Sequence, residues 1–329
     1  MMRANGVLPT PQEVRDAAAR IGSGITHTPL VRSEALSERA GGDVLLKLEC
    51  RQPGGSFKIR GALHALLSLS PAELAAGVVA SSAGNHGRGV AQAAERLGCS
   101  ATIFVPATAP QVKKDGIAAH GATVDDAAPN YDAAERAARA FARESGATFV
   151  GPCTGRALLA GAGTVALEIL QDLPNLGTVV VSVGGGGLVA GMAGFLRGTA
   201  PSVRIIGAQG VRTNAMALAI ASGRAADIPD LPTLADGLAG LVDVEMMAQG
   251  KAALDAIVTV EEEEIADAIR LLHREHGLVV EGSGAVGVAA LYTRRIVPQQ
   301  FPVAVTVTGA NIDGVKHDAI IRLGGESMR

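Results

Sequence analysis

Short apolar runs rich in β-branched residues alternate with alanine-rich helical segments along most of the chain. The strand-like runs cover residues 43–49, 77–81, 101–106, 178–184, 203–209 and 303–309. The clearest helical segments between them are 86–98 and 131–146. Few tight hairpin signals separate the strand-like runs. This alternation predicts an α/β protein whose mainly parallel sheets are covered by helices on both faces.

The composition predicts a large aliphatic core and excludes several classes of partner. Of 329 residues, 48% are hydrophobic, 19% are charged and 2% are aromatic, which suits a globular chain of two domains. A net charge of −3 indicates neither nucleic acid nor an anionic membrane as a partner. Cys50, Cys99 and Cys153 form no C-x-x-C pair, and the N-terminus lacks the apolar region of a signal peptide. We therefore expect a cytoplasmic protein.

Four consecutive glycines, Gly184–Gly187, interrupt the uncharged segment 176–196. The segment is long enough to cross a bilayer, but each internal glycine costs a helix about 1 kcal/mol relative to alanine. A strand, a glycine loop and a helix describe it better. Bare backbone N–H groups before a helix suit the close approach of one anion. The tract is neither a P-loop nor a G-x-G-x-x-G turn.

A second glycine turn, Gly54–Gly55, precedes Phe57 and Lys58 at the start of a helical segment. The anion site at the glycine tract has no lysine of its own, and Lys58 has no phosphate motif around it. Pyridoxal phosphate (PLP) needs both features, a cup for its phosphate and an amine for a Schiff base. The two motifs together favour a PLP enzyme.

A third feature is an acidic run that should begin a helix at residues 259–277. Thr259 and Glu262 have the spacing of a capping box, and Gly277 is placed to end the helix. The histidines at 273 and 276 lie in the last turn, where we expect cations rather than metal ligands.

A series of short motifs then identifies the chain as similar to one family. They are "THTPL", "LKLE", "GSFKIRGA", "SSAGNHGRGVA", "GTVALEI", "GGGGLVAG", "ADGLA", "EGSGAVGVAAL" and "TGANID". In this order they resemble the serine/threonine dehydratase branch of fold-type II PLP enzymes, which includes threonine deaminases and serine racemases. The resemblance implies an α/β fold like that of tryptophan synthase β, with two domains that each hold a mainly parallel twisted sheet flanked by helices. The large domain would comprise 1–76 and 152–329, and the small domain, 77–151, would close over the substrate.

The resemblance also implies roles for individual residues. Lys58 matches the Schiff-base lysine, which then takes the Cα proton, and Phe57 would lie beside the cofactor ring. The other cofactor contacts would be Asn85, Gly184, Gly185, Gly186, Gly187, Leu188, Glu281 and Thr308. The substrate carboxylate would bind the loop of Ser82, Ala83, Gly84, Asn85 and His86, with His86 ordering that loop.

Two of these residues indicate the type of reaction. Thr308 offers the pyridine nitrogen a hydroxyl, which is too weak an acid to keep it protonated, and this favours loss of a β-substituent. Ala83 stands where the family's racemases carry serine, so the second face of the substrate has no proton carrier. We predict an ammonia-lyase that converts a β-hydroxy-α-amino acid, such as L-threonine or L-serine, to a 2-oxo acid and ammonia.

The chain departs from the family pattern in two places. Gln209 and Ala215 align with the Glu and Asp of the family's divalent-metal site, so we expect no metal there. Within 151–164, Thr154 replaces an acidic residue and Arg156 lies close by, either on an extra substrate carboxylate or in solvent.

Several alternatives stay open at this point. The altered stretch 151–164 motivates a dehydratase of 3-hydroxyaspartate, phenylserine or a hydroxyectoine-breakdown intermediate. A racemase, a β-replacement synthase and a non-catalytic PLP-binding protein are less favoured. The family resemblance implies a homodimer.

Overall fold

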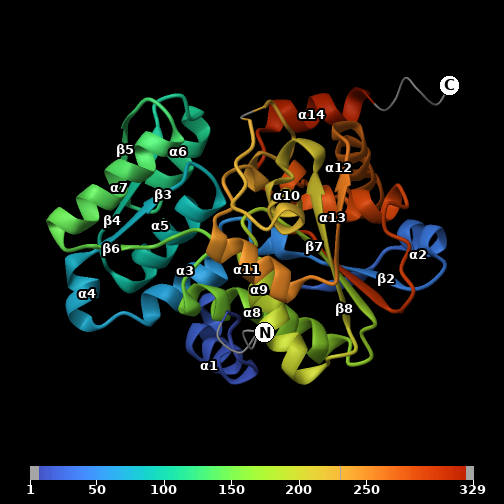
Figure 1. Ribbon diagram of the computed structural model, residues 1–329. Helices are drawn as coiled ribbons and strands as arrows, with labels where there is room; N and C mark the ends of the chain where they lie inside the picture. The colour runs from blue at the N-terminus through green and yellow to red at the C-terminus, as the bar shows by residue number, and fades with distance from the viewer. Residues whose placement is uncertain (1–6, 230, 324–329) are drawn as a thin grey trace.

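Two helix-covered sheets lie side by side in the computed structural model, which describes residues 7–229 and 231–323 (Figure 1). The strands are β1 (Leu30–Arg32), β2 (Val44–Lys47), β3 (Val78–Ser81), β4 (Ala101–Pro106), β5 (Thr123–Ala128), β6 (Thr148–Phe149), β7 (Thr178–Ser182), β8 (Arg204–Gly210), β9 (Ala256–Val260) and β10 (Val303–Thr306).

Helices make up most of the rest of the described chain. The α-helices are α1 (Pro11–Ile21), α2 (Glu34–Ala40), α3 (Lys58–Leu67), α4 (Pro71–Ala76), α5 (Asn85–Leu97), α6 (Gln111–Ala118), α7 (Tyr131–Ser145), α8 (Arg156–Asp172), α9 (Gly187–Thr199), α10 (Ala215–Ser222), α11 (Val244–Ala253), α12 (Glu262–His276), α13 (Gly282–Tyr292) and α14 (Gly314–Leu323). The short 3₁₀ helices are η2 (Gly22–Gly24), η3 (Glu49–Arg51), η4 (Val211–Thr213) and η5 (Asp236–Leu238).

The sheet topology confirms the predicted α/β class with mainly parallel sheets. The six-stranded sheet has the order β1-β2-β10-β7-β8-β9, and the four-stranded sheet has the order β5-β4-β3-β6. β1 pairs antiparallel with β2, whereas the other strand pairs are parallel. The four-stranded sheet takes its strands from residues 78–149, and the six-stranded sheet takes them from the chain on both sides of that segment.

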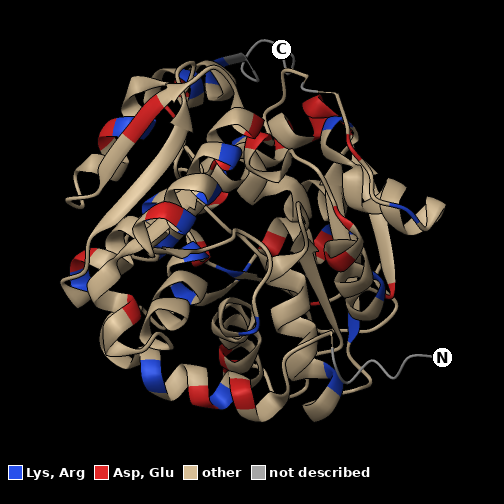
Figure 2. Ribbon diagram, turned by 60° about the vertical axis from the view of Figure 1, so that its left-hand side comes forward, with Lys and Arg blue, Asp and Glu red and all other residues tan. Residues whose placement is uncertain are grey.

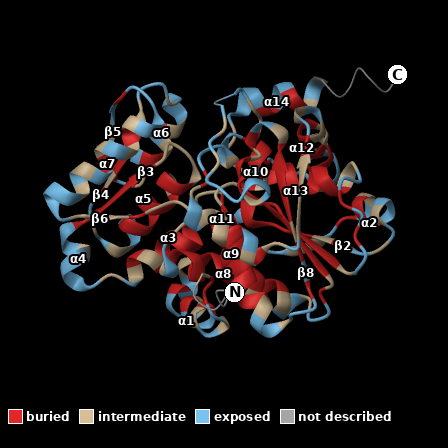
Figure 3. Ribbon diagram, in the orientation of Figure 1, coloured by how far each residue is buried: buried red, intermediate tan, exposed pale blue. Residues whose placement is uncertain are grey.

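The core follows the centre of each sheet (Figure 3). Every residue of β7 and of β10 is buried, because both faces of these neighbouring parallel strands are covered by helices. The loops that leave their carboxyl ends therefore emerge side by side at one edge of the sheet. The loop after β7 carries the glycine tract, and the loop after β10 carries Thr308. In open α/β sheets, ligands bind at the edge formed by the carboxyl ends of the strands.

The uncharged segment 176–196 folds as the strand, loop and helix that the glycines predicted. β7 precedes the glycine tract and α9 follows it. No helix of the described residues is both long and apolar enough to cross a membrane. Acidic and basic residues are interspersed over the helices around both sheets (Figure 2).

The predicted start of α12 was wrong. Thr259 belongs to β9, where it pairs with Gln209, and the helix is capped two residues later at Glu261, whose backbone N–H donates to the Glu264 side chain over 2.7 Å. The β-branched run before the acidic residues extends the strand and delays the helix. Gly277 ends α12 in the left-handed conformation, as predicted. Burial lowers the pKa of His276, so this histidine is not the cation expected in the last turn.

Candidate active site

Lys58 is the first residue of α3 and follows a turn that only glycine suits. Gly54 and Gly55 have φ values of +80° and +78°, in the left-handed region. A Cβ on Gly54 would lie 2.6 Å from Oε1 of Gln92, and one on Gly55 would lie 2.7 Å from Oδ1 of Asn311. Both conformation and space therefore require the two glycines that precede Lys58.

The amine of Lys58 lies close to the glycine tract. Its Nζ donates to the carbonyl of Pro152 over 2.9 Å and lies 5.3 Å from the centre of the Phe57 ring. The next residue, Cys153, packs against the tract so closely that a Cβ on Gly185 would lie 2.7 Å from its Sγ. Residues 152 and 153 thus connect the lysine amine to the glycine tract.

The glycine tract presents unpaired backbone N–H groups. Among the described residues, no acceptor takes a hydrogen bond from the N–H groups of Gly184–Gly187. Gly186 has a φ of +86°, and α9 begins at Gly187 with Leu188 buried behind it. These donors lie at the positive end of the α9 dipole, so the tract has the geometry and the electrostatics that suit an anion.

The predicted carboxylate loop links β3 to α5. Ser82 Oγ accepts a hydrogen bond from the N–H of Gly84 over 3.2 Å, and α5 begins at Asn85. His86 is buried, and its Nε2–H donates to the carbonyl of Val150 over 2.8 Å. Burial, followed by the charge of Lys58, lowers the pKa of His86 to about 3. His86 is therefore neutral, and its hydrogen bond fixes the position of the loop.

The loop after β10 places Thr308 beside the start of α3. The N–H of Phe57 donates to the carbonyl of Thr308 over 3.1 Å, and the N–H of Ala310 donates to the carbonyl of Gly55 over 2.8 Å. Thr308 is buried, and within residues 7–229 and 231–323 its hydroxyl has no hydrogen-bond partner. The hydroxyl is thus available to a ligand.

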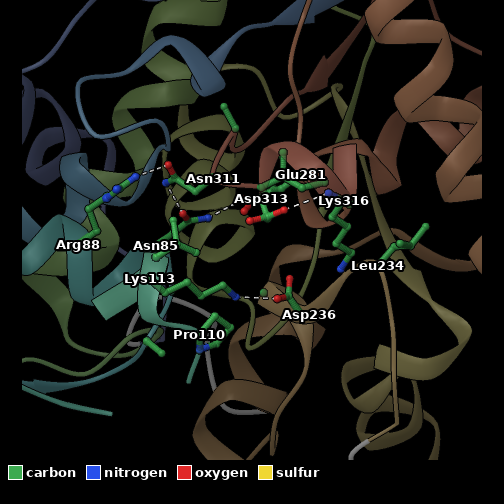
Figure 4. A pocket seen from close by; sticks show the side chains of 17 residues that line it. Asn85, Arg88, Pro110, Lys113, Leu234, Asp236, Glu281, Asn311, Asp313 and Lys316 are labelled. Carbon is green, nitrogen blue, oxygen red and sulfur yellow. Dashed lines mark hydrogen bonds and ion pairs between the residues drawn. The ribbon is translucent and has the colours of Figure 1, made fainter. Parts of the chain in front are cut away.

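A chain of hydrogen bonds crosses the site through Asn85 (Figure 4). Nδ2 of Asn85 donates to Glu281 over 2.5 Å, and Oδ1 of Asn85 accepts from Nδ2 of Asn311 over 2.6 Å. Asn311 in turn accepts from the guanidinium of Arg88. The partners on both sides fix the orientation of the Asn85 amide. Asn311 and Arg88 were not among the predicted site residues, although they lie within the motifs "TGANID" and "SSAGNHGRGVA".

Glu281 caps α13 and is buried beside Asn85. Burial raises the pKa of this carboxyl to about 7, and the hydrogen bond from Asn85 opposes that rise. Asp236 adds to it through charge repulsion. At neutral pH the carboxyl is therefore divided between its protonated and ionised forms.

A cavity of about 510 Å³ opens beside Asn85 and Glu281. It lies between the 82–86 loop and α6 on one side and the loops of the six-stranded sheet on the other. Lys113 of α6 and Asp236 of η5 form an ion pair across it at 2.7 Å (Figure 4). Ala83 and Gly84 line this cavity, whereas Lys58 and the glycine tract do not.

Arg156, left open between a substrate contact and solvent, lies on the surface. Its Nη2 donates to Glu13 of α1 over 2.7 Å, and this side-chain bond is the main cause that lowers the pKa of Glu13 to about 2. Its side chain is 45% exposed and does not line the cavity. Arg156 therefore belongs to the contact between α8 and α1.

The sequence model of the pyridoxal-phosphate dependent enzyme family matches residues 21–309 of the chain. The chain belongs to this family. Among similar proteins, L-threonine ammonia-lyase of Thermotoga maritima is 41% identical over 96% of this chain and 79% of its own length. L-threonine ammonia-lyase of Geobacter sulfurreducens is 38% identical over 94% of this chain and 78% of its own.

Solved structures of related PLP enzymes have the same fold. Threonine deaminase isoform 2 of Solanum lycopersicum, in its processed form, gives a TM-score of 0.89 at 34% identity, over 95% of this chain and 93% of its own. Maize serine racemase gives a TM-score of 0.89 at 29% identity, over 96% of this chain and 98% of its own. Together with the family match, these structures confirm the fold-type II class and the PLP cofactor that the motifs predicted.

The chemical groups at the candidate site match those of the PLP cofactor. The unpaired N–H groups of Gly184–Gly187 suit its phosphate, and the lysine amine near them suits its aldehyde. The unpartnered Thr308 hydroxyl suits the ring nitrogen. The tract has no room for side chains, because a Cβ on Gly187 would lie 3.0 Å from Cα of Cys153.

Glu281 should make the cofactor-free PLP enzyme less stable as pH rises. Its pKa is about 7 in the folded protein and 4.5 ordinarily, so the folded state holds the proton more tightly between these values. The free energy of unfolding should therefore fall by on the order of 3 kcal/mol from pH 4.5 to pH 8 through this group. Glu281→Gln keeps an acceptor for Asn85 but removes this dependence.

Urea unfolding of the two proteins across this pH range checks the effect. The variant should gain stability relative to the parent as pH rises, because the parent alone must ionise a buried carboxyl. Parallel pH curves would show that the pKa of Glu281 is not raised.

Proposed function

We propose that the protein is a PLP-dependent ammonia-lyase that converts L-threonine or L-serine to a 2-oxo acid and ammonia. The water lost with the β-hydroxyl is taken up again when the enamine product hydrolyses, so ammonia is the net leaving group. The observation that carries this proposal is the 41% identity to an L-threonine ammonia-lyase over 96% of the chain. The three segments that carry Lys58, the 82–86 loop and the glycine tract support it, since each provides a group that this reaction needs.

Lys58 is the proposed proton carrier. When bound, PLP withdraws electrons from the substrate Cα and so makes its proton acidic. The Lys58 amine first holds the cofactor and then takes the Cα proton, because its place at the start of α3 keeps it near the glycine tract. The tract would hold the phosphate, and the Thr308 hydroxyl would contact the ring nitrogen without protonating it.

The 82–86 loop is the proposed carboxylate site. The N–H groups at the start of α5 would offer a carboxylate the favourable end of the helix dipole. Asn85, held by Asn311 and Glu281, would bind the 3′-oxygen of the cofactor. Neither the methyl group of Ala83 nor the neutral His86 can return a proton to the second face of Cα. Elimination is therefore favoured over racemisation.

A 2-oxo acid assay with the PLP-loaded protein tests the proposal. The panel contains L- and D-threonine, L- and D-serine, 3-hydroxyaspartate and phenylserine, together with the hydroxylated intermediate of hydroxyectoine breakdown. We expect the highest kcat/KM with L-threonine, with ammonia and 2-oxo acid formed in equal amounts and little D-amino acid.

Each competing assignment has its own outcome in the same assay. A kcat/KM higher with 3-hydroxyaspartate or phenylserine than with L-threonine would show that threonine is not the preferred substrate. Release of D-amino acid at a rate comparable with 2-oxo acid would indicate a racemase. Turnover that requires sulfide and an O-acetylated substrate would indicate a β-replacement synthase.

The proposal includes a cytoplasmic homodimer with a mobile small domain at residues 77–151. The free thiols of Cys50, Cys99 and Cys153 suit a reducing compartment. The Lys113–Asp236 ion pair joins the proposed small domain to the large one across the cavity. Light scattering of the purified protein tests the dimer, and a monomer at working concentration would contradict it.

A further inference from the structure

Gln209 forms a buried polar clamp near the glycine tract. Its side chain is 0% exposed at the carboxyl end of β8. Nε2 donates to the carbonyl of Val183 over 3.0 Å and to the carbonyl of Thr213 over 2.9 Å. Oε1 accepts from the N–H of Ala217 over 2.9 Å. The amide thus makes three hydrogen bonds and joins the end of β7, η4 and α10.

These residues do not fit the divalent metal that the family resemblance implies at this strand end. Mg²⁺ and Ca²⁺ take oxygen ligands, chiefly carboxylates and carbonyls. The carbonyl oxygens of Val183 and Thr213 converge here, but both already accept a hydrogen bond from the –NH₂ group of Gln209. Gln209 and Ala215 supply no carboxylate, and no group of three His, Cys, Asp or Glu residues that could hold a metal occurs in the described chain.

We propose that the Gln209 amide takes the place of a structural cation and makes this enzyme independent of divalent metal. Its –NH₂ group draws the two carbonyl oxygens together, as a cation would, without the charge. Its Oε1 also accepts a hydrogen bond from the N–H of Ala217, which a cation could not do. The buried polar groups are satisfied within the chain itself.

The clamp bears directly on the phosphate site. Val183 immediately precedes Gly184. α10, held through Ala217, packs on the tract, since a Cβ on Gly186 would lie 2.9 Å from Cε of Met216. Gln209 is therefore a positioning residue for the glycine tract. Its loss should weaken cofactor retention as well as stability.

Gln209→Glu tests the proposal, because it places a carboxylate oxygen against the same two carbonyls. The PLP-loaded wild type and variant are melted in EDTA, in MgCl₂ and in CaCl₂, with choline chloride matching ionic strength. The wild-type Tm should stay within about 1 °C throughout. In EDTA the variant should melt at a lower temperature than the wild type, because the carboxylate oxygen repels the two carbonyl oxygens. Its Tm should rise by about 3–8 °C with Ca²⁺ or Mg²⁺, since a cation bound between these oxygens would remove the repulsion.

Gln209→Met is the matched control, because it fills similar space without a donor or a ligand. It should melt lower than the wild type and show no gain with either cation, which separates cation replacement from simple loss of packing. Cofactor affinity, measured by PLP absorbance, should follow the Tm values. It should be lower in both variants than in the wild type, and Ca²⁺ or Mg²⁺ should raise it only in Gln209→Glu.

A wild-type Tm or cofactor affinity that rises saturably with Mg²⁺ or Ca²⁺ would overturn the proposal. So would a stoichiometric metal in the purified wild type, measured by elemental analysis, or a soluble Gln209→Glu that no cation rescues. The wild-type measurements decide the matter if that variant does not fold. They are independent of substrate, so a wrong assignment of threonine would leave them unchanged.

Discussion

Replacing Lys58 by alanine should lower kcat/KM for L-threonine by at least about a thousand-fold, because the variant lacks the proposed general base and the proposed covalent anchor of the cofactor. The glycine tract and Thr308 remain, so the variant should still bind PLP, though reversibly. Borohydride reduction should fix the cofactor covalently to the protein. Peptide mapping should then find it on Lys58 in the wild type and on no lysine in the variant.

Lys251→Ala is a suitable control, since Lys251 is an exposed lysine on α11. It should leave kcat/KM and the reduction pattern unchanged. Reduction that labels a different lysine in the wild type, or an alanine variant within tenfold of wild-type activity, would remove the assignment of Lys58.

The sequence was sufficient for the parts of the fold that depend on local pattern. The apolar β-branched runs became β2, β3, β4, β7, β8 and β10, because strands that helices cover on both faces are largely apolar. The short strands β1, β6 and β9 were missed, since two to five residues carry little periodicity. The wrong cap at Thr259 has the same origin, because pairing of β9 with β8 outweighed the local capping pattern.

The local geometry of the candidate site could be predicted where contiguous residues determine it. The unpaired N–H groups of Gly184–Gly187 and the position of Lys58 depend mainly on their own motifs. Contacts between distant segments were not recoverable. The bond from Arg88 to Asn311 joins residues 223 apart, and no local pattern encodes it. Arg156, for which a substrate contact and solvent exposure were both left open, pairs with Glu13, which lies 143 residues away in the sequence.

The largest buried electrostatic feature was also missing from the sequence analysis. Arg60, two residues after Lys58, is 0% exposed and donates to Glu49 and to Glu168, with the Nε–Oε2 and Nη1–Oε1 distances both 2.7 Å. Lys47 donates to Glu168 as well, over 2.6 Å. Burial acts to raise the pKa of Glu168, but Arg60 and Lys47 outweigh it and hold that pKa below 4.5. This network fastens α3, and with it Lys58, to α8 and η3.

Arg60→Met should therefore destabilise the protein by about 3–5 kcal/mol, because it leaves two buried carboxylates short of a partner. Urea unfolding at pH 7 measures the loss. The difference from wild type should narrow as pH falls below 4.5, the ordinary pKa of Glu168. A protonated Glu168 no longer needs the guanidinium, so the stability that this carboxylate gives the wild type above that pH is lost as acid is added.

Arg156→Met is the matched control, since Arg156 also forms a two-point contact with a carboxylate but at 45% side-chain exposure. Water screens that pair, so its loss should cost less than about 1 kcal/mol. Equal losses in the two variants would mean that burial does not determine the strength of these pairs. A small loss for Arg60→Met would mean that water reaches the two carboxylates, and α3 would then need another anchor to keep Lys58 in place.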